Sequence, residues 1–383
     1  MNPTVKLSLG IYIGLLAPAA LATDVHDPPP ATLELSQAVE QLLTTGECGG
    51  CFLRYANLSG QNLSGAQLGG ADLTASDLSR TVFYRANLAG ADLRGADLAS
   101  ASLGSSDLSG ADLRALDLSN GRLSRALLRG ARLAGSDLTG ANLGAADLTD
   151  ADLRGADLSG AILRHALLAG VDLSGGRLRD VDLRQTDLSK VGTLAGSELN
   201  GADLYKANLA GCNLEAVLLV DADLTGASLA KARLAGSDLS QANLSKADLT
   251  GADLSGTVLV EANLTGAMLS GARLNGAILI GARLSGNLIE VNLSELDLSG
   301  ADLSGANLKG ANFRNARLIG AAFHRANLYG ADFTGADLSK ASFHHANLRH
   351  ARFDDAKLDG TSFKDALSDR DTAEVQSMDP SDK

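Results

Sequence analysis

Between Leu53 and Phe363, leucine or phenylalanine recurs at every fifth residue of the chain. Of the sixty-three positions in this series, 56 are Leu and seven are Phe. The residue two before each centre is usually Ala, the residue just before it is usually Asp or Asn, and Gly often closes the unit. The count slips only twice: it resumes one residue late at Leu194 and one residue early at Leu288. A repeat this regular constrains the fold strongly and the chemistry hardly at all.

A period of five fits neither of the common secondary structures. An α-helix repeats its faces every 3.6 residues and a strand every 2, so either would carry the leucines away from a single buried face. A short extended piece followed by a corner does fit, with Ala and Leu inside and the other three residues facing water. Gly eases the corner backbone, and Asn, Asp and Ser bond the local backbone in turns. Coils of this kind hydrogen-bond to each other like parallel strands, and each needs its neighbours to bury its leucines. The sequence therefore predicts an all-β parallel solenoid.

The unit resembles the A(D/N)LXX pattern of the pentapeptide-repeat family, and the similarity covers residues 51–365. Matching stretches are Ala71-Asp72-Leu73, Ala141-Asn142-Leu143 and Ala336-Asp337-Leu338. The resemblance implies a right-handed quadrilateral parallel β-helix with four units in each coil. Sixty-three units then give about sixteen coils and a rod roughly 75 Å long at the spacing of parallel strands. Because members of the family differ in function, the resemblance implies a fold and not a single activity.

The first 22 residues have the pattern of a secretory signal. Lys6 precedes the apolar stretch Leu7–Leu16, and an Ala-Leu-Ala cleavage motif ends at Ala22. We expect export to the periplasm or the exterior with cleavage after Ala22; the alternative is an uncleaved membrane anchor. No later stretch approaches eighteen apolar residues, so no membrane span is expected in the mature chain. A Pro-rich linker, residues 23–31, follows.

Residues 32–50 are predicted to form an N-terminal cap that contains a short amphipathic helix. Leu35, Ala38, Val39, Leu42 and Leu43 fall at helical spacing before Gly46. Such a helix would cover the open first coil, as solenoid ends require. The alternative is a loosely ordered leader. At the other end, residues 366–383 are polar and are predicted to be a disordered tail.

Three cysteines are present. Cys48 and Cys51 precede the repeats, and in an exported protein they favour a disulfide that joins the cap to the rod. Two free thiols or a thioredoxin-type redox pair are the alternatives, although the βαβ context of the latter is missing. Cys212 stands where Ala is usual, so we expect it to be a small buried residue.

The histidines cluster late in the chain. His324 and His344 each follow a central Phe and lie one predicted coil apart, with His345 beside the second. Two or three imidazoles at such spacing could hold zinc or copper. The alternative is an exposed polar ladder that continues with Lys364, a cation that would oppose metal binding. We expect no metal and no cofactor, and keep these three histidines as the candidates for a metal site.

Aspartates twenty residues apart are predicted to form one acidic line along the rod. They are Asp77, Asp97, Asp117, Asp137 and Asp157. Arg94, Arg114 and Arg154 are expected to line the adjoining face and to relieve part of the repulsion. The line is either a solvated set of corners or, as in topoisomerase-protecting members of the family that the chain resembles, a mimic of nucleic-acid phosphates. Export opposes mimicry, and so do two basic zones, Arg122, Arg125, Arg129 and Arg132, and Lys309, Arg314, Arg317 and Arg325.

The interior of the C-terminal third is predicted to be aromatic. Phe313, Phe333 and Phe353 should form one ladder, and Phe323, Phe343 and Phe363 a second on the opposite wall. The two slips of the repeat, at Lys190–Thr193 and before Asn287, should distort one corner each.

No pattern of a catalytic site is recognisable in the sequence. It has no phosphate-cradling loop, no strand-turn-helix nucleophile and no paired carboxylates in a sheltered position, and a filled rod offers no concave pocket. We therefore expect a non-enzymatic, exported structural or interaction rod with a protein partner and without a nucleic-acid partner. The formal charge of −12 fits a soluble acidic protein of this kind. The alternatives are a nucleic-acid-mimicking inhibitor and a metal-binding protein that uses His324 and His344.

Overall fold

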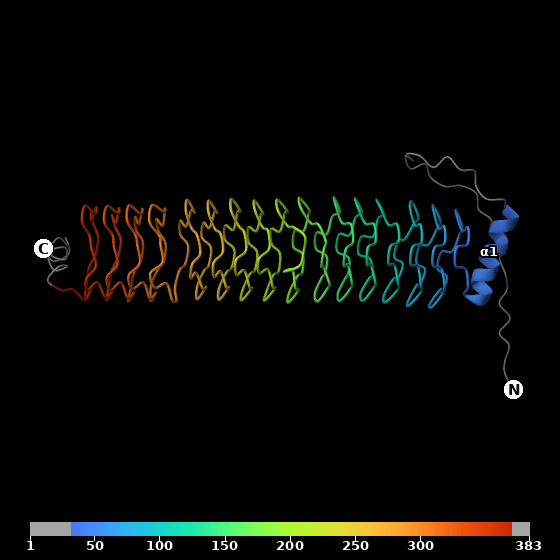
Figure 1. The fold of residues 1–383 in the computed structure, drawn as a ribbon, viewed down its shortest axis with the longest axis horizontal. Helices are drawn as coiled ribbons and strands as arrows, with labels where there is room; N and C mark the ends of the chain where they lie inside the picture. Colours follow the sequence, from blue (N-terminus) through green and yellow to red (C-terminus); the bar gives the residue numbers. More distant parts are fainter. Residues whose placement is uncertain (1–31, 370–383) are drawn as a thin grey trace, which may run out of the picture.

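The computed structural model describes residues 32–369 of the 383-residue chain. One helix, α1 (Thr32–Thr45), lies across the N-terminal end of a long rod that the rest of the described chain forms (Figure 1). The predicted signal 1–22, the linker 23–31 and residues 370–383 of the predicted tail lie outside the described residues. No described helix has the length and apolar character needed to cross a bilayer.

Residues 47–367 wind into coils that pair through single-residue parallel bridges instead of long strands. Phe52 pairs with Asp72, and Asp72 pairs with Asp92, so one coil takes twenty residues. The Leu53 N–H donates to the Asp72 carbonyl at 2.7 Å, and the Asp72 N–H donates to the Cys51 carbonyl at 2.9 Å. Four pentapeptides therefore complete each coil, which confirms the predicted four-sided parallel solenoid.

Each pentapeptide ends in a tight turn. The Ala56 N–H donates to the Leu53 carbonyl at 3.1 Å, and the third turn residue, Tyr55, has φ of 60°. Type II turns require positive φ at that position, and Gly adopts it without strain. Gly60 occupies the next corner with φ of 69°, but Arg325 takes the same conformation with φ of 57°. A non-glycine residue held in this region costs about 1 kcal/mol, which the stacked coils must offset.

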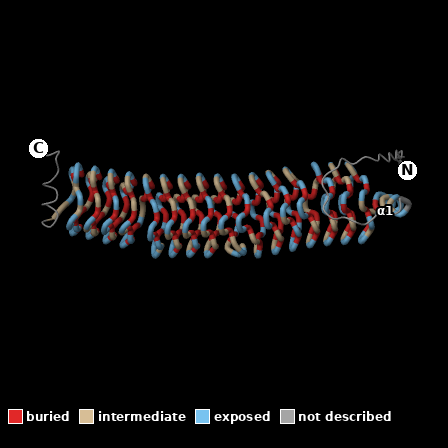
Figure 2. Tube along the Cα trace, turned by 90° about the horizontal axis from the view of Figure 1, so that it is seen from above, coloured by how far each residue is buried: buried red, intermediate tan, exposed pale blue. Residues whose placement is uncertain are grey.

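The interior is built from the central residue and the residue two before it. The central leucines and the inward alanines are almost completely buried, and exposed corners separate them along the whole rod (Figure 2). Each buried Leu contributes about 2 kcal/mol. Where Ser or Thr replaces the inward Ala, its hydroxyl donates to a nearby carbonyl: Ser76 to Leu73 at 2.6 Å and Thr81 to Leu58 at 2.7 Å. These buried hydroxyl groups are thus satisfied.

The two slips of the repeat shift the ladder without interrupting it. Asp172 pairs with Thr193, twenty-one residues ahead, and Ile278 pairs with Asp297, nineteen residues ahead. The corner before the second slip requires Gly286, since its φ is 122° and a Cβ there would lie 3.1 Å from the Gly266 Cα. The distortion is confined to corners, because the central leucines on either side of both slips stay at most 3% exposed.

The two phenylalanine ladders form as predicted. Phe313 stacks on Phe333 with ring centroids 4.8 Å apart, and Phe323 stacks on Phe343 at 4.7 Å. Rings of different ladders meet edge to face at 5.7–6.1 Å. Both geometries are the favourable ones for aromatic pairs.

An amide ladder runs along the outside of the same region. The Asn327 side-chain amide donates to Asn307 at 3.0 Å, and the Asn347 amide donates to Asn327 at 3.1 Å.

The coil pairing also continues beyond residue 365, because Leu367 still pairs with Asn347. The first residues of the predicted tail therefore complete a coil, since Ala366 and Leu367 occupy the inward and bridge positions of one more unit.

We predict that amides in residues 300–365 are the last in the rod to exchange with deuterium, because aromatic stacking and the amide ladder stabilise these coils. Hydrogen exchange with peptide resolution measures this order. If these amides exchange before those of residues 100–165, the ladders do not stabilise the C-terminal coils.

Candidate functional site

Helix α1 and the disulfide close the N-terminal end of the rod. Leu42 is buried, and Leu35, Ala38 and Val39 pack against the core, whereas Leu43 faces solvent at 47% exposure. The helix ends where the Gly46 N–H donates to the Leu42 carbonyl at 2.9 Å.

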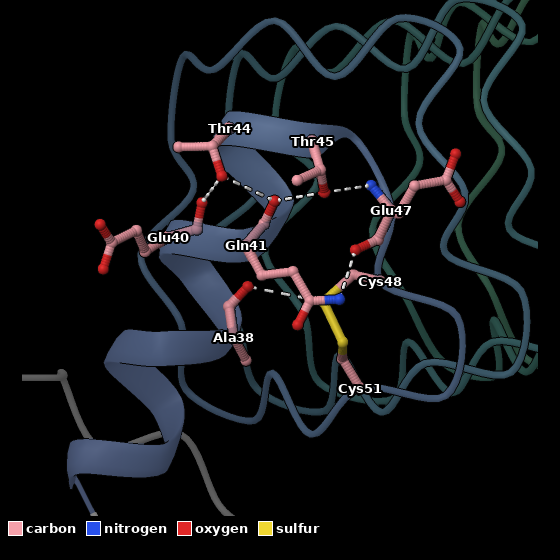
Figure 3. The surroundings of a disulfide bond; sticks show 8 residues. All are labelled: Ala38, Glu40, Gln41, Thr44, Thr45, Glu47, Cys48 and Cys51. Atoms are coloured by element: carbon pink, nitrogen blue, oxygen red, sulfur yellow. Dashed lines mark hydrogen bonds between the residues drawn. A yellow bond between two sulfur atoms is a disulfide. The ribbon is translucent and has the colours of Figure 1, made fainter.

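Cys48 and Cys51 are joined by a disulfide directly below the helix end (Figure 3). Beside it, the Gln41 side-chain amide donates to the Glu47 carbonyl at 2.9 Å, and the Glu47 N–H donates to the Thr45 hydroxyl at 3.0 Å. Hydrogen bonds from the helix to Glu47 thus hold α1 against the first coil, and the disulfide closes the chain between Cys48 and Cys51 within that coil.

Cys212 lies in the interior at 5% exposure and is the free cysteine of the described chain. Its Sγ–H donates to the Leu188 carbonyl at 3.0 Å, as the inward Ser and Thr hydroxyls do elsewhere. Burial raises the pKa of the Cys212 thiol to about 11, so the nucleophilic thiolate is suppressed. Cys212 is a structural residue and not a candidate nucleophile.

The line of aspartates forms turns. Asp77 Oδ1 accepts the Ser79 N–H at 3.0 Å and the Ser79 hydroxyl at 2.6 Å. Asp97 and Asp117 accept the N–H two residues ahead, each at 2.9 Å. Each carboxylate thus holds its own corner, which is the ordinary role of Asp in a turn.

The arginines predicted to compensate this line pair elsewhere. Arg94 contacts Asp92 and Arg114 contacts Asp112, both at 2.6 Å, and Arg154 contacts Asp152 at 2.8 Å. Their expected relief of the Asp77–Asp157 line is not seen among the ion pairs of the described residues. The reason is geometric: each guanidinium folds back onto the turn aspartate of its own unit.

The histidines come together at one corner. The His324 and His344 rings stack with centroids 5.1 Å apart and planes at 13°. Their Nε2 atoms share hydrogen bonds with the Ser342 and Ser362 hydroxyls, each at 2.9 Å. Together with His345, Ser304, Gly305 and Arg325, they line a hollow that is open to solvent.

The structure does not gather the histidines into a metal-ligand set. His345 Nε2 lies 3.9 Å from an Asp365 carboxylate oxygen, and His350 lies at another corner, beside Tyr329 and Asp369. No group of three or more His, Cys, Asp or Glu side chains suited to a metal ion occurs in residues 32–369.

Sequence reasoning missed an apolar patch on the outer face. Val258 and Ile278 pair on adjacent coils at a position usually taken by Asp or Asn, and Leu218 lies in the same ladder beyond Asp238. Val220, Val260 and Ile280 occupy the corner position beside them. Leu218, Ile278 and Ile280 are each 38–39% exposed. The sequence does contain a sign of this patch. Apolar residues replace polar or small ones at two positions of a coil, Val258 and Val260, and again twenty residues later, at Ile278 and Ile280.

Acid should weaken the rod through its turn aspartates. The Ser339 hydroxyl at 2.6 Å and the Ser339 N–H at 3.1 Å hold the pKa of Asp337 below its usual value. A carboxyl with a lowered folded-state pKa stabilises the protein above the unfolded value of 3.8 and loses that stabilisation as pH falls through the folded value.

We predict that Asp337→Asn keeps stability at pH 7 but makes its loss between about pH 4 and 2 less steep, because an Asn side-chain oxygen also accepts the turn bonds. Denaturant unfolding at several pH values measures this. Asp355→Asn, which replaces an exposed carboxylate that makes no hydrogen bond in the described structure, is the control. Identical acid profiles for the two variants would contradict the prediction.

Comparison with known proteins identifies the repeat. The family description "Pentapeptide repeats (8 copies)" matches consecutive stretches from residues 48–80 to residues 326–365. No curated protein sequence matches the chain significantly.

The solved structures that are similar to the chain include three such proteins. HetL of the cyanobacterium Nostoc sp. strain PCC 7120, involved in heterocyst differentiation regulation, is 32% identical over 64% of this chain and 94% of HetL, with a TM-score of 0.23. Rfr23 of the cyanobacterium Cyanothece 51142 is 26% identical over 42% of this chain and 91% of its own, with a TM-score of 0.14. A trypsin-treated variant of QnrB1, a plasmid-mediated fluoroquinolone resistance protein, is 22% identical over 54% of this chain and 88% of its own, with a TM-score of 0.18.

The repeat and the geometry of the coils identify the family and its fold. A coil of twenty residues, a central Leu or Phe in each of four units, and a match over residues 48–365 agree with one another. The chain belongs to the pentapeptide-repeat family and folds as a right-handed quadrilateral β-helix.

Proposed function

We propose that this protein is an exported, non-catalytic rod that binds another protein through the apolar patch of Leu218, Val220, Val258, Val260, Ile278 and Ile280. The observation that carries the proposal is the patch itself. Its residues occupy positions that face water, where the repeat otherwise places polar or small residues, so their exposed apolar area gains stability only when a partner covers it.

The rest of the described surface supports binding more than catalysis. Many turn aspartates and arginines are engaged in hydrogen bonds and ion pairs, as at Asp77 and Arg114. The hollow at His324 and a second one between Leu274 and Leu296 both open to solvent, whereas a substrate pocket usually encloses most of its ligand. A rigid row of coils instead presents side chains at a fixed spacing, which suits an extended protein contact.

Export is the second part of the proposal. Residues 1–22 carry the secretory pattern, and the Cys48–Cys51 disulfide suits an oxidising compartment. The alternative of a nucleic-acid-mimicking inhibitor, which the acidic line raised, would require retention inside the cell.

We predict that the full chain, expressed in a bacterial host, is recovered outside the cytoplasm with Thr23 as its first residue. Cell fractionation and mass spectrometry of the intact protein measure this. Deleting Leu7–Leu16 should retain the chain in the cytoplasm. Cytoplasmic recovery of the unaltered chain would contradict export and favour the nucleic-acid-mimic alternative, whereas an uncleaved membrane-bound form would indicate an anchor.

We predict that the double variant Val258→Asn/Ile278→Asn reduces partner recovery at least tenfold. Asn is a regular residue of this position, and its side chain accepts a turn N–H, as Asn87 accepts the Ala89 N–H at 3.0 Å, so the fold should persist. Quantitative affinity capture from the compartment of the mature protein is the measurement. Leu167→Asn is the matched control, since Leu167 is 55% exposed at the same repeat position but pairs with Asp147. Equal recovery by both variants would exclude the patch as the binding surface.

A further inference from the structure

One corner of the C-terminal third concentrates basic side chains on consecutive coils. The residues after Leu303, Phe323, Phe343 and Phe363 are Ser304–Gly305, His324–Arg325, His344–His345 and Lys364–Asp365. Because Ser304 and Gly305 are small, the corner opens into a hollow that the histidines and Arg325 line. The rings of His324 and His344 stand 5.1 Å apart in this hollow.

The corner lacks the acidic partner that neutralises bases elsewhere in the rod. A base directly after a central residue can contact the aspartate of its own unit, as Arg94 does, or the residue eighteen positions ahead, on the next coil. Arg54 meets Asp72 there at 3.5 Å, Arg129 meets Asp147 at 2.5 Å, and Arg314 meets Asp332 at 3.0 Å. His324 and His344 also contact the residue eighteen positions ahead, but that residue is a serine, Ser342 or Ser362. A serine hydroxyl satisfies one ring nitrogen and supplies no negative charge.

The remaining charges at this corner nearly cancel without the histidines. Arg325 is exposed and forms no ion pair within the described residues, and Lys364 is the cation of the next coil. Of the two nearby acids, Asp365 lies 3.9 Å from His345, and Asp302 accepts the Ser304 N–H at 3.0 Å. With two fixed cations and two acids, the net charge of the corner is decided by His324, His344 and His345.

We propose that this hollow binds a tetrahedral oxyanion of the sulfate or phosphate class, and that it binds more tightly as the imidazoles become protonated. An imidazole gains its charge between about pH 8 and 5. Two stacked imidazolium rings repel each other, and a divalent anion beside them removes that repulsion. An imidazolium donates from both ring nitrogens, so with Nε2 bonded to serine the Nδ1–H remains for the anion, and the Arg325 guanidinium adds a forked donor suited to oxyanions.

This inference goes beyond the proposed function and does not depend on it. The hollow lies in the corner after Phe323 and Phe343, and the apolar patch belongs to coils before residue 284. Neither export nor a protein partner is needed for an anion to bind there, so each proposal stands or fails on its own experiment.

The test is a sulfate titration of the purified full chain, with chloride holding the ionic strength constant. Sulfate is used because it stays divalent from pH 5.5 to 8, so a change in affinity reports the protein. With isotope-labelled histidine, the six histidines give few enough NMR signals to follow each ring. We expect the signals of His324, His344 and His345 to shift on saturable binding, with an affinity at least tenfold higher at pH 5.5 than at pH 8. An affinity that does not change with pH, or shifts without saturation, would overturn the proposal.

The decisive variant is Ser342→Asp, which restores the acid found at the equivalent position beside Arg314. We expect it to weaken sulfate binding at pH 5.5 at least tenfold and to preserve the fold, since Asp is a regular residue of this position. Ser228→Asp, at the same repeat position in another ladder, is the matched control and should bind as the unaltered chain does. Equal affinities for the two variants would exclude the hollow.

A second variant separates a lost site from a disturbed fold. His324→Gln/His344→Gln retains side-chain donors for the serines and leaves His345 as the one histidine in the hollow. We therefore expect the pH dependence of sulfate binding to fall at least threefold while thermal unfolding stays unchanged. A zinc titration of the unaltered chain completes the test, because metal binding needs neutral imidazole and strengthens as pH rises. Zinc binding at pH 8 without sulfate binding at pH 5.5 would replace the anion site by a metal site.

Discussion

The whole structure depends on the burial of one large apolar side chain every five residues. A leucine can leave water only if coils above and below cover it, so the chain must return to the same wall after twenty residues. That return places a peptide group of each wall opposite the one before it, and the parallel hydrogen bonds follow, as between Leu53 and Asp72. This winding has a cost in conformational energy, which arises at the corners. Backbone in the left-handed region recurs at nearly all of them, and the aspartate or asparagine bonds of the turns offset part of that strain.

The interior residues are nearly the same in every coil. The features that distinguish this protein are therefore the outer-face residues that differ from the repeat pattern. The position just before each central residue is normally a turn-forming Asp or Asn. Val258 and Ile278 give up that bond and expose apolar area, whereas Ser342 and Ser362 keep a hydroxyl but remove a charge. The first departure leaves a surface that water solvates poorly, and the second leaves basic groups without a counterion. Two functions of different chemistry can therefore occupy one rod without changing its core.

Much of the fold was predictable from the sequence, because the period of five and the burial of Leu admit few solutions. The Phe313 and Phe323 ladders, the end of the helix before Gly46 and the register shifts at the two slips all follow from counting residues. The surface was less predictable. A surface side chain can contact a partner in its own unit or one on the next coil, and Arg94 contacts Asp92 in its own unit. Three further features depend on neighbours in space, which the spacing of residues does not reveal. They are the exposure of Leu43, the coil completed by Leu367 and the hollow beside Gly305.

The buried Cys212 makes the middle of the rod observable. Its thiol is enclosed between coils and donates to the Leu188 carbonyl next to the first slip. A reagent that modifies thiolates can reach it only when these coils separate, and its high pKa keeps background reaction slow. The rate of alkylation of this single atom would therefore report how often the column breaks open near the slip, without any engineered label.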